Sequence, residues 1–140
     1  MEPSVLQFLQ KNILLVAVAV ASGTLLVWPM LRRSSGGPWV SAVEATQLMN
    51  REDALVVDVR DAGAYASGHI IGARNVPAER VEALPPEVAK RKDRPIIVCC
   101  ERGERAARAA AALRRQGFQR VLSLSGGLAA WRQAGLPVQK

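Results

Sequence analysis

The chain has 140 residues, which is enough for one domain of ordinary size and a short additional segment. Hydrophobic residues make up 49% of it and charged residues 22%, which excludes an intrinsically disordered chain. The net charge is +7, but the cations are scattered along the chain and aromatic residues make up only 4%. This pattern disfavours nucleic acid as a partner and is better explained by attraction to anionic lipid headgroups.

The first patterned segment is residues 12–31, which contain no charged side chain and consist mostly of Leu, Val and Ala. A helix of this length would be about 30 Å long, the thickness of the hydrocarbon core of a bilayer. We therefore predict one transmembrane helix at 12–31, after a short N-terminal segment (1–11) and before a linker (32–38). A cleaved signal peptide is the alternative, but the positive charge expected before its apolar region is scarce here.

Two cations, Arg32 and Arg33, follow the apolar segment directly. By the positive-inside rule they place the C-terminal domain in the cytoplasm, as part of a single-pass protein of the inner (plasma) membrane. A chain with only two cysteines also fits a reducing compartment. Ala19 and Gly23 are four residues apart, a spacing that would let two such helices approach closely and form a weak homodimer.

The remaining residues, 39–140, are predicted to form one domain in which strands and helices alternate. The spacing of Ser41 and Glu44 is that of a capping box, which predicts a helix to about Asn50. Strands are expected at 55–59, 74–76, 96–99 and 121–124. Further helical segments are expected at 81–92, interrupted by Pro85 and Pro86, at 105–113 and at 128–134. This alternation predicts an α/β fold, an open parallel sheet with helices on both faces.

Two adjacent cysteines, Cys99 and Cys100, close the strand at 96–99 and precede a loop that leads into an Ala-rich helix. Backbone N–H groups and the helix dipole favour a thiolate there, and cysteines so placed have pKa values of about 3.5–7.5. Gly103 would let the loop curl so that its N–H groups point inward and hold an anion. Since side chains alternate along a strand, Cys99 is expected on the packed face opposite Cys100.

Buried cysteines are also common as plain core residues, so the residue type alone does not decide between packing and catalysis. The order of strand, cysteine, glycine turn and Arg-bearing helix favours a nucleophile at Cys100. Arg105, in the first helical turn, opposes the helix dipole at a cost of about 0.3–1 kcal/mol, which a negative ligand in the loop would offset.

Three separated motifs resemble those of the rhodanese family of sulfurtransferases. Residues 100–106, CERGERA, resemble the family's active-site loop, Cys-x-x-Gly-x-Arg-Ser/Ala. The segments VDVR (57–60) and YASGHIIGARNVP (65–77) resemble its N-terminal signature, and VLSLSGGLAAW (121–131) resembles its C-terminal signature. The motifs follow the family's order over about residues 40–138.

The resemblance implies a membrane-anchored, bacterial-type sulfurtransferase that needs no cofactor and no metal. Cys100 would take a sulfur atom from thiosulfate or a persulfide and pass it to a thiol or another nucleophile. The persulfide would be held by the loop residues Glu101, Arg102, Gly103, Glu104 and Arg105, with the arginines stabilising its negative charge. Two glutamates balance two arginines in this loop, which disfavours a small dianionic donor such as thiosulfate.

Asp58 and Arg60 lie near the carboxyl end of the predicted strand at 55–59, the edge where open α/β sheets bind ligands. If this strand neighbours the cysteine strand, the two residues support the loop from behind. Alternatively, Asp58 only satisfies nearby loop N–H groups. His69 is the only histidine, and we expect a hydrogen-bonded core residue rather than a catalytic partner of the cysteine.

Two rival functions remain open. Four residues separate Cys100 from Arg105, as in sulfurtransferase loops, whereas five separate Cys99 from Arg105, as in Cys-dependent phosphatases and arsenate reductases on the same fold. Val98 and Ala106 stand where the phosphatase pattern has His and Ser or Thr, which favours the sulfurtransferase register. The other rival is a non-catalytic rhodanese module that binds a protein partner at the membrane.

Overall fold

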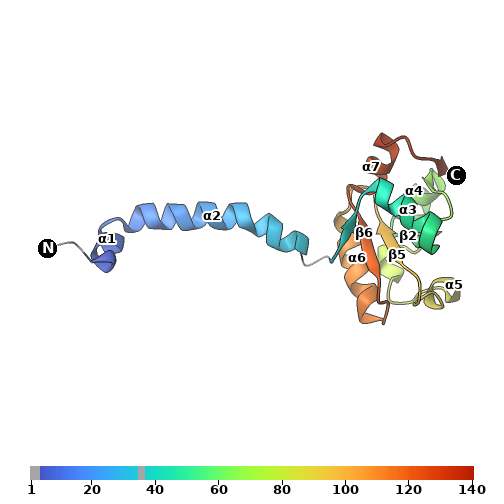
Figure 1. The fold of residues 1–140 in the computed structure, drawn as a ribbon, viewed down its shortest axis with the longest axis horizontal. Helices are drawn as coiled ribbons and strands as arrows, with labels where there is room; N and C mark the ends of the chain where they lie inside the picture. Colours follow the sequence, from blue (N-terminus) through green and yellow to red (C-terminus); the bar gives the residue numbers. More distant parts are fainter. Residues whose placement is uncertain (1–3, 35–36) are drawn as a thin grey trace. The chain divides into compact units, whose positions relative to one another are not determined.

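The structure, a computed structural model, describes residues 4–34 and 37–140. The chain forms two compact units, Met1–Ser35 and Gly36–Lys140 (Figure 1). The first unit is helical, and the second contains every strand of the described residues.

The N-terminal unit consists of helix α1, Val5–Lys11, and helix α2, Ile13–Ser34. Helix α1 lies in the segment for which the sequence predicted no structure. Ser4 caps it by accepting a hydrogen bond from the Gln7 N–H at 3.3 Å, and Asn12 separates the two helices. Helix α2 continues three residues into the predicted linker, because neither Gly nor Pro follows Pro29 before residue 36.

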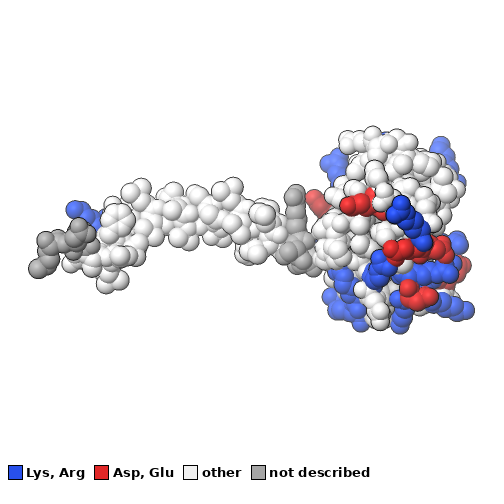
Figure 2. Space-filling view, viewed as in Figure 1, with Lys and Arg blue, Asp and Glu red and all other residues white. Residues whose placement is uncertain are grey.

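Ile13–Leu31 of α2 is long and apolar enough to cross a membrane, as the composition predicted. Its side chains are largely exposed, and Leu14, for example, is 79% exposed. The hydroxyl of Thr24 donates to the Val20 carbonyl at 2.7 Å, so this polar group is satisfied within the helix. No charged side chain lies on the visible face of this segment (Figure 2).

The second unit is built on a five-stranded parallel sheet, as the alternating pattern predicted. Its strands, in spatial order, are β1 (Trp39–Val40), β6 (Val121–Leu124), β5 (Ile96–Cys99), β2 (Leu55–Asp58) and β4 (Arg74–Asn75). Strand β1 was not predicted, since two residues are too few to show a period. A separate antiparallel pair joins β3, His69–Ile70, to β7, Val138–Gln139.

Helices cover both faces of the sheet (Figure 1). Helix α6, Glu104–Arg115, packs its alanines and Leu113 against one face. The other face is covered by α3 (Ala42–Glu52), α4 (Ala62–Ala66) and α7 (Gly127–Gln133). The predicted capping box of α3 is present: the Ser41 N–H donates to Glu44 at 2.8 Å and the Glu44 N–H to Ser41 at 3.2 Å.

The helical segment predicted over residues 81–92 is interrupted at Pro85 and Pro86, as predicted, but less of it is helical than expected. The structure has a 3₁₀ turn at Ala78–Arg80 and one short helix, α5, at Pro86–Ala89. Pro85 and Pro86 explain the difference, because their fixed φ suits the start of a helix and not its interior.

Helix α6 begins at Glu104, one residue before the predicted start, and ends in a Schellman motif at Gly117. Gly117, with φ +98°, donates to the Arg114 carbonyl, and Phe118 donates to the Leu113 carbonyl at 3.3 Å. The helix therefore has fixed ends, which sets the position of the loop that precedes it.

Strands β2 and β5 are neighbours, with Asp58 opposite Cys99. The Val59 N–H continues the pairing by donating to the Cys99 carbonyl at 2.9 Å. The register brings the carboxyl ends of both strands together. The motif at residues 57–60 and the motif at residues 100–106 therefore meet at one edge of the sheet.

Candidate active site

The cysteine loop is the four-residue connection between Cys99, the end of β5, and Glu104, the start of α6. Gly103 is the N-cap of α6, and its φ of +108° lies in the region that favours glycine. This conformation turns the Gly103 N–H toward Cys100, whose Sγ accepts its hydrogen bond at 2.9 Å. The structure thus places Cys100 at the helix N-terminus, with a backbone donor aimed at the sulfur.

The two cysteines point to opposite faces of the sheet, as strand alternation predicted. Cys99 belongs to the core beneath α3 and α7, whereas Cys100 belongs to the core beneath α6. Cys99 is fully buried, and this burial, with a smaller contribution from the Asp58 carboxylate, raises its thiol pKa well above the ordinary value. Cys99 therefore remains a neutral thiol at physiological pH.

Helix α7 fixes the outer side of the cysteine loop. The N–H of Leu128 donates to the Cys100 carbonyl at 2.9 Å, and the N–H of Ala129 donates to the Glu101 carbonyl at 3.0 Å. Gly127 makes this approach feasible, since a Cβ there would lie 2.4 Å from the Cys100 carbonyl oxygen. The glycine turn that leads into α7 thus borders the cysteine loop.

Asp58 and Arg60 form a buried ion pair behind the loop. The Arg60 Nη2 donates to Asp58 at 2.7 Å and also to the Gly68 carbonyl at 2.7 Å. The Arg60 backbone N–H donates to Asp58 at 3.0 Å, so the carboxylate both satisfies a loop N–H and holds a cation. The hydrogen bonds to Asp58 raise the pKa of Arg60 above its usual value, which keeps the guanidinium charged despite its burial.

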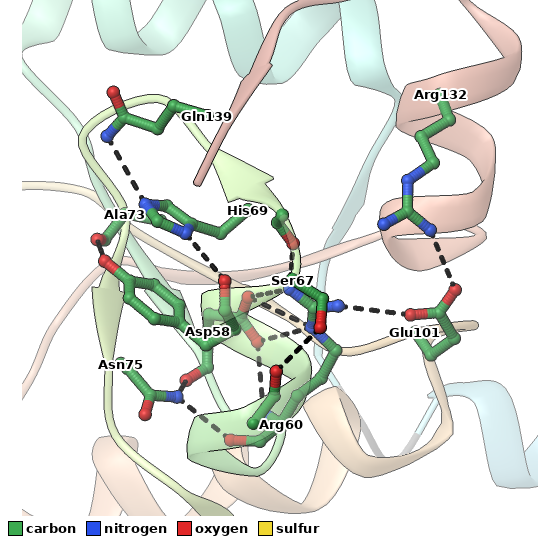
Figure 3. Close-up of polar contacts among 12 residues, drawn as sticks. Asp58, Arg60, Ser67, His69, Ala73, Asn75, Glu101, Arg132 and Gln139 are labelled. Carbon is green, nitrogen blue, oxygen red and sulfur yellow. Dashed lines mark hydrogen bonds and ion pairs between the residues drawn. The ribbon is translucent and has the colours of Figure 1, made fainter.

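Arg60 reaches the cysteine loop through Glu101. The Glu101 carboxylate lies between two guanidinium groups, with Arg60 Nη1 and Arg132 Nη1 each 3.3 Å from one of its oxygens (Figure 3). Arg60 comes from the segment after β2 and Arg132 from α7. Arg132 was not among the predicted site residues, because nothing in its local pattern distinguishes it from other surface arginines.

A cavity of about 390 Å³ opens over the loop. It is lined by Arg60, Asp61, Ala64, Cys100, Glu101, Arg102, Glu104 and Arg105. Four of the five predicted loop residues, all but Gly103, thus line the same cavity as Cys100 and Arg60. Among the residues that the structure describes, Arg102 and Arg105 form no ion pair, so their charges are available to a ligand.

His69 is a core residue, as predicted. Its ring stacks on Tyr65 with 3.7 Å between centroids. Its Nδ1 lies 2.8 Å from the Tyr65 carbonyl oxygen and its Nε2 lies 3.3 Å from the Gln139 side chain (Figure 3). Both ring nitrogens therefore serve the fold. Within residues 4–34 and 37–140, no cluster of side chains is suited to hold a metal ion.

The arrangement of these residues can be compared with that in known proteins. A model of the rhodanese-like domain matches residues 41–134. The chain belongs to the rhodanese family. A rhodanese-like domain from Anabaena is 32% identical and has a TM-score of 0.61, with 73% of this chain and 78% of that one covered. A protein of Rhodopseudomonas palustris described as a possible tyrosine phosphatase is 26% identical, with a TM-score of 0.65 and 73% and 84% covered.

Two curated relatives extend the comparison. A protein named sulfurtransferase from Allochromatium vinosum is 38% identical over 66% of this chain and 84% of its own length. The uncharacterised protein YibN of Escherichia coli K12 is 35% identical over 96% of this chain and 95% of its own length. The alignment with YibN covers 96% of the 140 residues of this rhodanese. It therefore includes most of the N-terminal helical unit.

Proposed function

We propose that this rhodanese is a sulfurtransferase that carries a sulfur atom as a persulfide on Cys100. The observation that carries the proposal is the placement of the two thiols. Cys100 lines the cavity and its Sγ accepts a hydrogen bond from the N–H of Gly103, the N-cap of α6, whereas Cys99 is buried on the opposite face of the sheet. Sequence similarity to a protein named sulfurtransferase supports the same function.

In the first half-reaction, the Cys100 thiolate attacks the outer sulfur of the donor. A new S–S bond forms, the bond between that sulfur and the rest of the donor breaks, and the leaving group departs with the electron pair. The Gly103 N–H and the unpaired Arg102 and Arg105 stabilise the negative charge on the sulfur. In the second half-reaction an acceptor thiolate attacks the outer sulfur, which releases the Cys100 thiolate.

Because the two cysteines are adjacent, the main alternative function is that of a phosphatase or arsenate reductase. It would need Cys99 as the nucleophile, with five residues between Cys99 and Arg105. Cys99 is fully buried with a raised pKa, and it does not line the cavity. The geometry therefore supports the shorter loop and sulfur transfer.

We further propose that α2 anchors the protein in the inner (plasma) membrane, with the lipid bilayer as a partner and the domain in the cytoplasm. The uncharged stretch Ile13–Leu31 supports this anchor, and the alignment with YibN extends over 96% of the chain. Arg32 and Arg33 support the cytoplasmic orientation. Ala19 and Gly23 would form the contact of a weak homodimer through this helix.

Intact mass measurement tests the sulfurtransferase function against the non-catalytic alternative. The purified full-length protein, in detergent, is incubated with thiosulfate or with a low-molecular-weight persulfide. We expect a gain of one sulfur atom that subsequent cyanide or thiol removes. If no donor modifies the protein, the non-catalytic module is the better description. Hydrolysis of aryl phosphates under the same conditions would support the phosphatase instead.

A further inference from the structure

The charges around Cys100 cancel. The cavity lining contains three cations, Arg60, Arg102 and Arg105, and three acidic side chains, Asp61, Glu101 and Glu104. The buried partner of Arg60 is Asp58, which compensates that cation from behind. Charged side chains of both signs also lie close together on the visible face of the domain (Figure 2). The cavity therefore lacks the excess positive charge that would attract a dianion.

Glu101 is the acidic residue that matters most for this balance. Its carboxylate is held from both sides, by Arg60 and by Arg132, so it occupies a donor of each guanidinium group. Its own backbone carbonyl is fixed by the Ala129 N–H. Glu104 also lines the cavity, but among the described residues it forms no ion pair. Glu101 therefore reduces the positive charge that its arginine partners offer to a ligand, whereas Glu104 contributes only its own negative charge.

We propose that Glu101 determines donor specificity by neutralising Arg60, the cavity arginine that a dianionic donor would need in addition to Arg102 and Arg105. This inference rests on the proposed function and names its donor class, a persulfide of a thiol carrier rather than thiosulfate. Attack of the thiolate on thiosulfate brings together three negative charges and expels sulfite, which is itself a dianion. Attack on a protonated persulfide, R–S–SH, gives Cys100–S–SH and a thiolate R–S⁻, with only one negative charge throughout.

The test compares two variants with the same charge change in the same cavity, E101Q and E104Q. Steady-state transfer is measured in the full-length protein with thiosulfate and with a low-molecular-weight persulfide. We expect E101Q to lower KM for thiosulfate about tenfold, the scale of a hydrogen bond to a charged group. E104Q should lower it about twofold, the scale of one exposed charge. The deciding quantity is the ratio of KM for thiosulfate to KM for the persulfide, which should fall further in E101Q than in E104Q.

A second measurement needs no turnover. Sulfate is an inert dianion, and its binding is read from the protection of Cys100 against alkylation. We expect sulfate to protect E101Q at about one tenth, and E104Q at about one half, of the concentration that wild type requires. Equal protection of E101Q and E104Q, or equal thiosulfate KM values, would overturn the role of Glu101. Since protection is independent of sulfur transfer, this result stands apart from a failure of the sulfurtransferase function.

Discussion

At the scale of single residues, adjacent thiols in one chain have opposite environments. Cys100 meets a backbone donor in an open cavity, whereas burial makes the charged form of Cys99 unfavourable. A neutral alkylating agent should therefore modify one thiol per native molecule, at Cys100, and the second only after unfolding. Peptide mapping by mass spectrometry checks this result, and native modification of Cys99 would contradict the assignment.

The raised pKa of Cys99 also makes stability depend on pH. A group whose pKa is higher in the folded state stabilises the fold below its unfolded pKa, and this contribution disappears as the pH rises toward the folded value. The free energy of unfolding of wild type should therefore fall above about pH 8.5, by at most about 1.4 kcal/mol per pH unit from this thiol. Urea unfolding of C99A should show a smaller decline, and equal slopes would contradict the prediction.

Removing one member of the buried pair of Asp58 and Arg60 is expected to cost more unfolding free energy than replacing both members with neutral side chains. R60M leaves the Asp58 carboxylate buried without its cation, and we expect a loss of about 3–5 kcal/mol of unfolding free energy. The double variant D58N/R60M removes both charges and should recover part of this loss. Chemical denaturation of the three proteins checks the order. A double variant less stable than R60M would contradict it.

At the scale of elements, the contact of α7 with the cysteine loop depends on one glycine. G127A would place a Cβ against the Cys100 carbonyl, so the loop and α7 must separate. We expect sulfur transfer to fall at least tenfold. G135A is the matched control, because Gly135 has a similar φ of +71° but open space around it. Both variants incur strain of about 1–2 kcal/mol in a left-handed conformation, so comparable activity in the two would contradict the role of the contact.

Elements with a long or capped pattern could be predicted from the sequence, and those set by tertiary contacts could not. The run at 96–99 and the capping box at Ser41 contain their own signals, and both are present. Strand β1 has two residues and exists because β6 pairs with it. The ion pairs of Glu101 bring together segments that are 41 and 31 residues away, and no local pattern reports such a meeting.

At the scale of the whole molecule, the N-terminal helical unit and the domain are separate units, and we propose that the first is a membrane anchor. The full chain should sediment with the inner membrane and resist extraction at high pH, whereas a chain that begins at Gly36 should remain soluble. Protease added to intact spheroplasts should spare the domain and should digest it once the membrane is ruptured. Digestion in intact spheroplasts would reverse the proposed orientation, and a soluble full-length chain would remove the anchor.

The central claim is that Cys100, and not its neighbour, carries the transferred sulfur. The most direct measurement is intact mass after incubation with a sulfur donor, on wild type, C100S and C99S. Wild type and C99S should each gain one sulfur atom that an acceptor thiol removes, while C100S should gain none. The account would be contradicted if C100S were modified and turned over while C99S were inert.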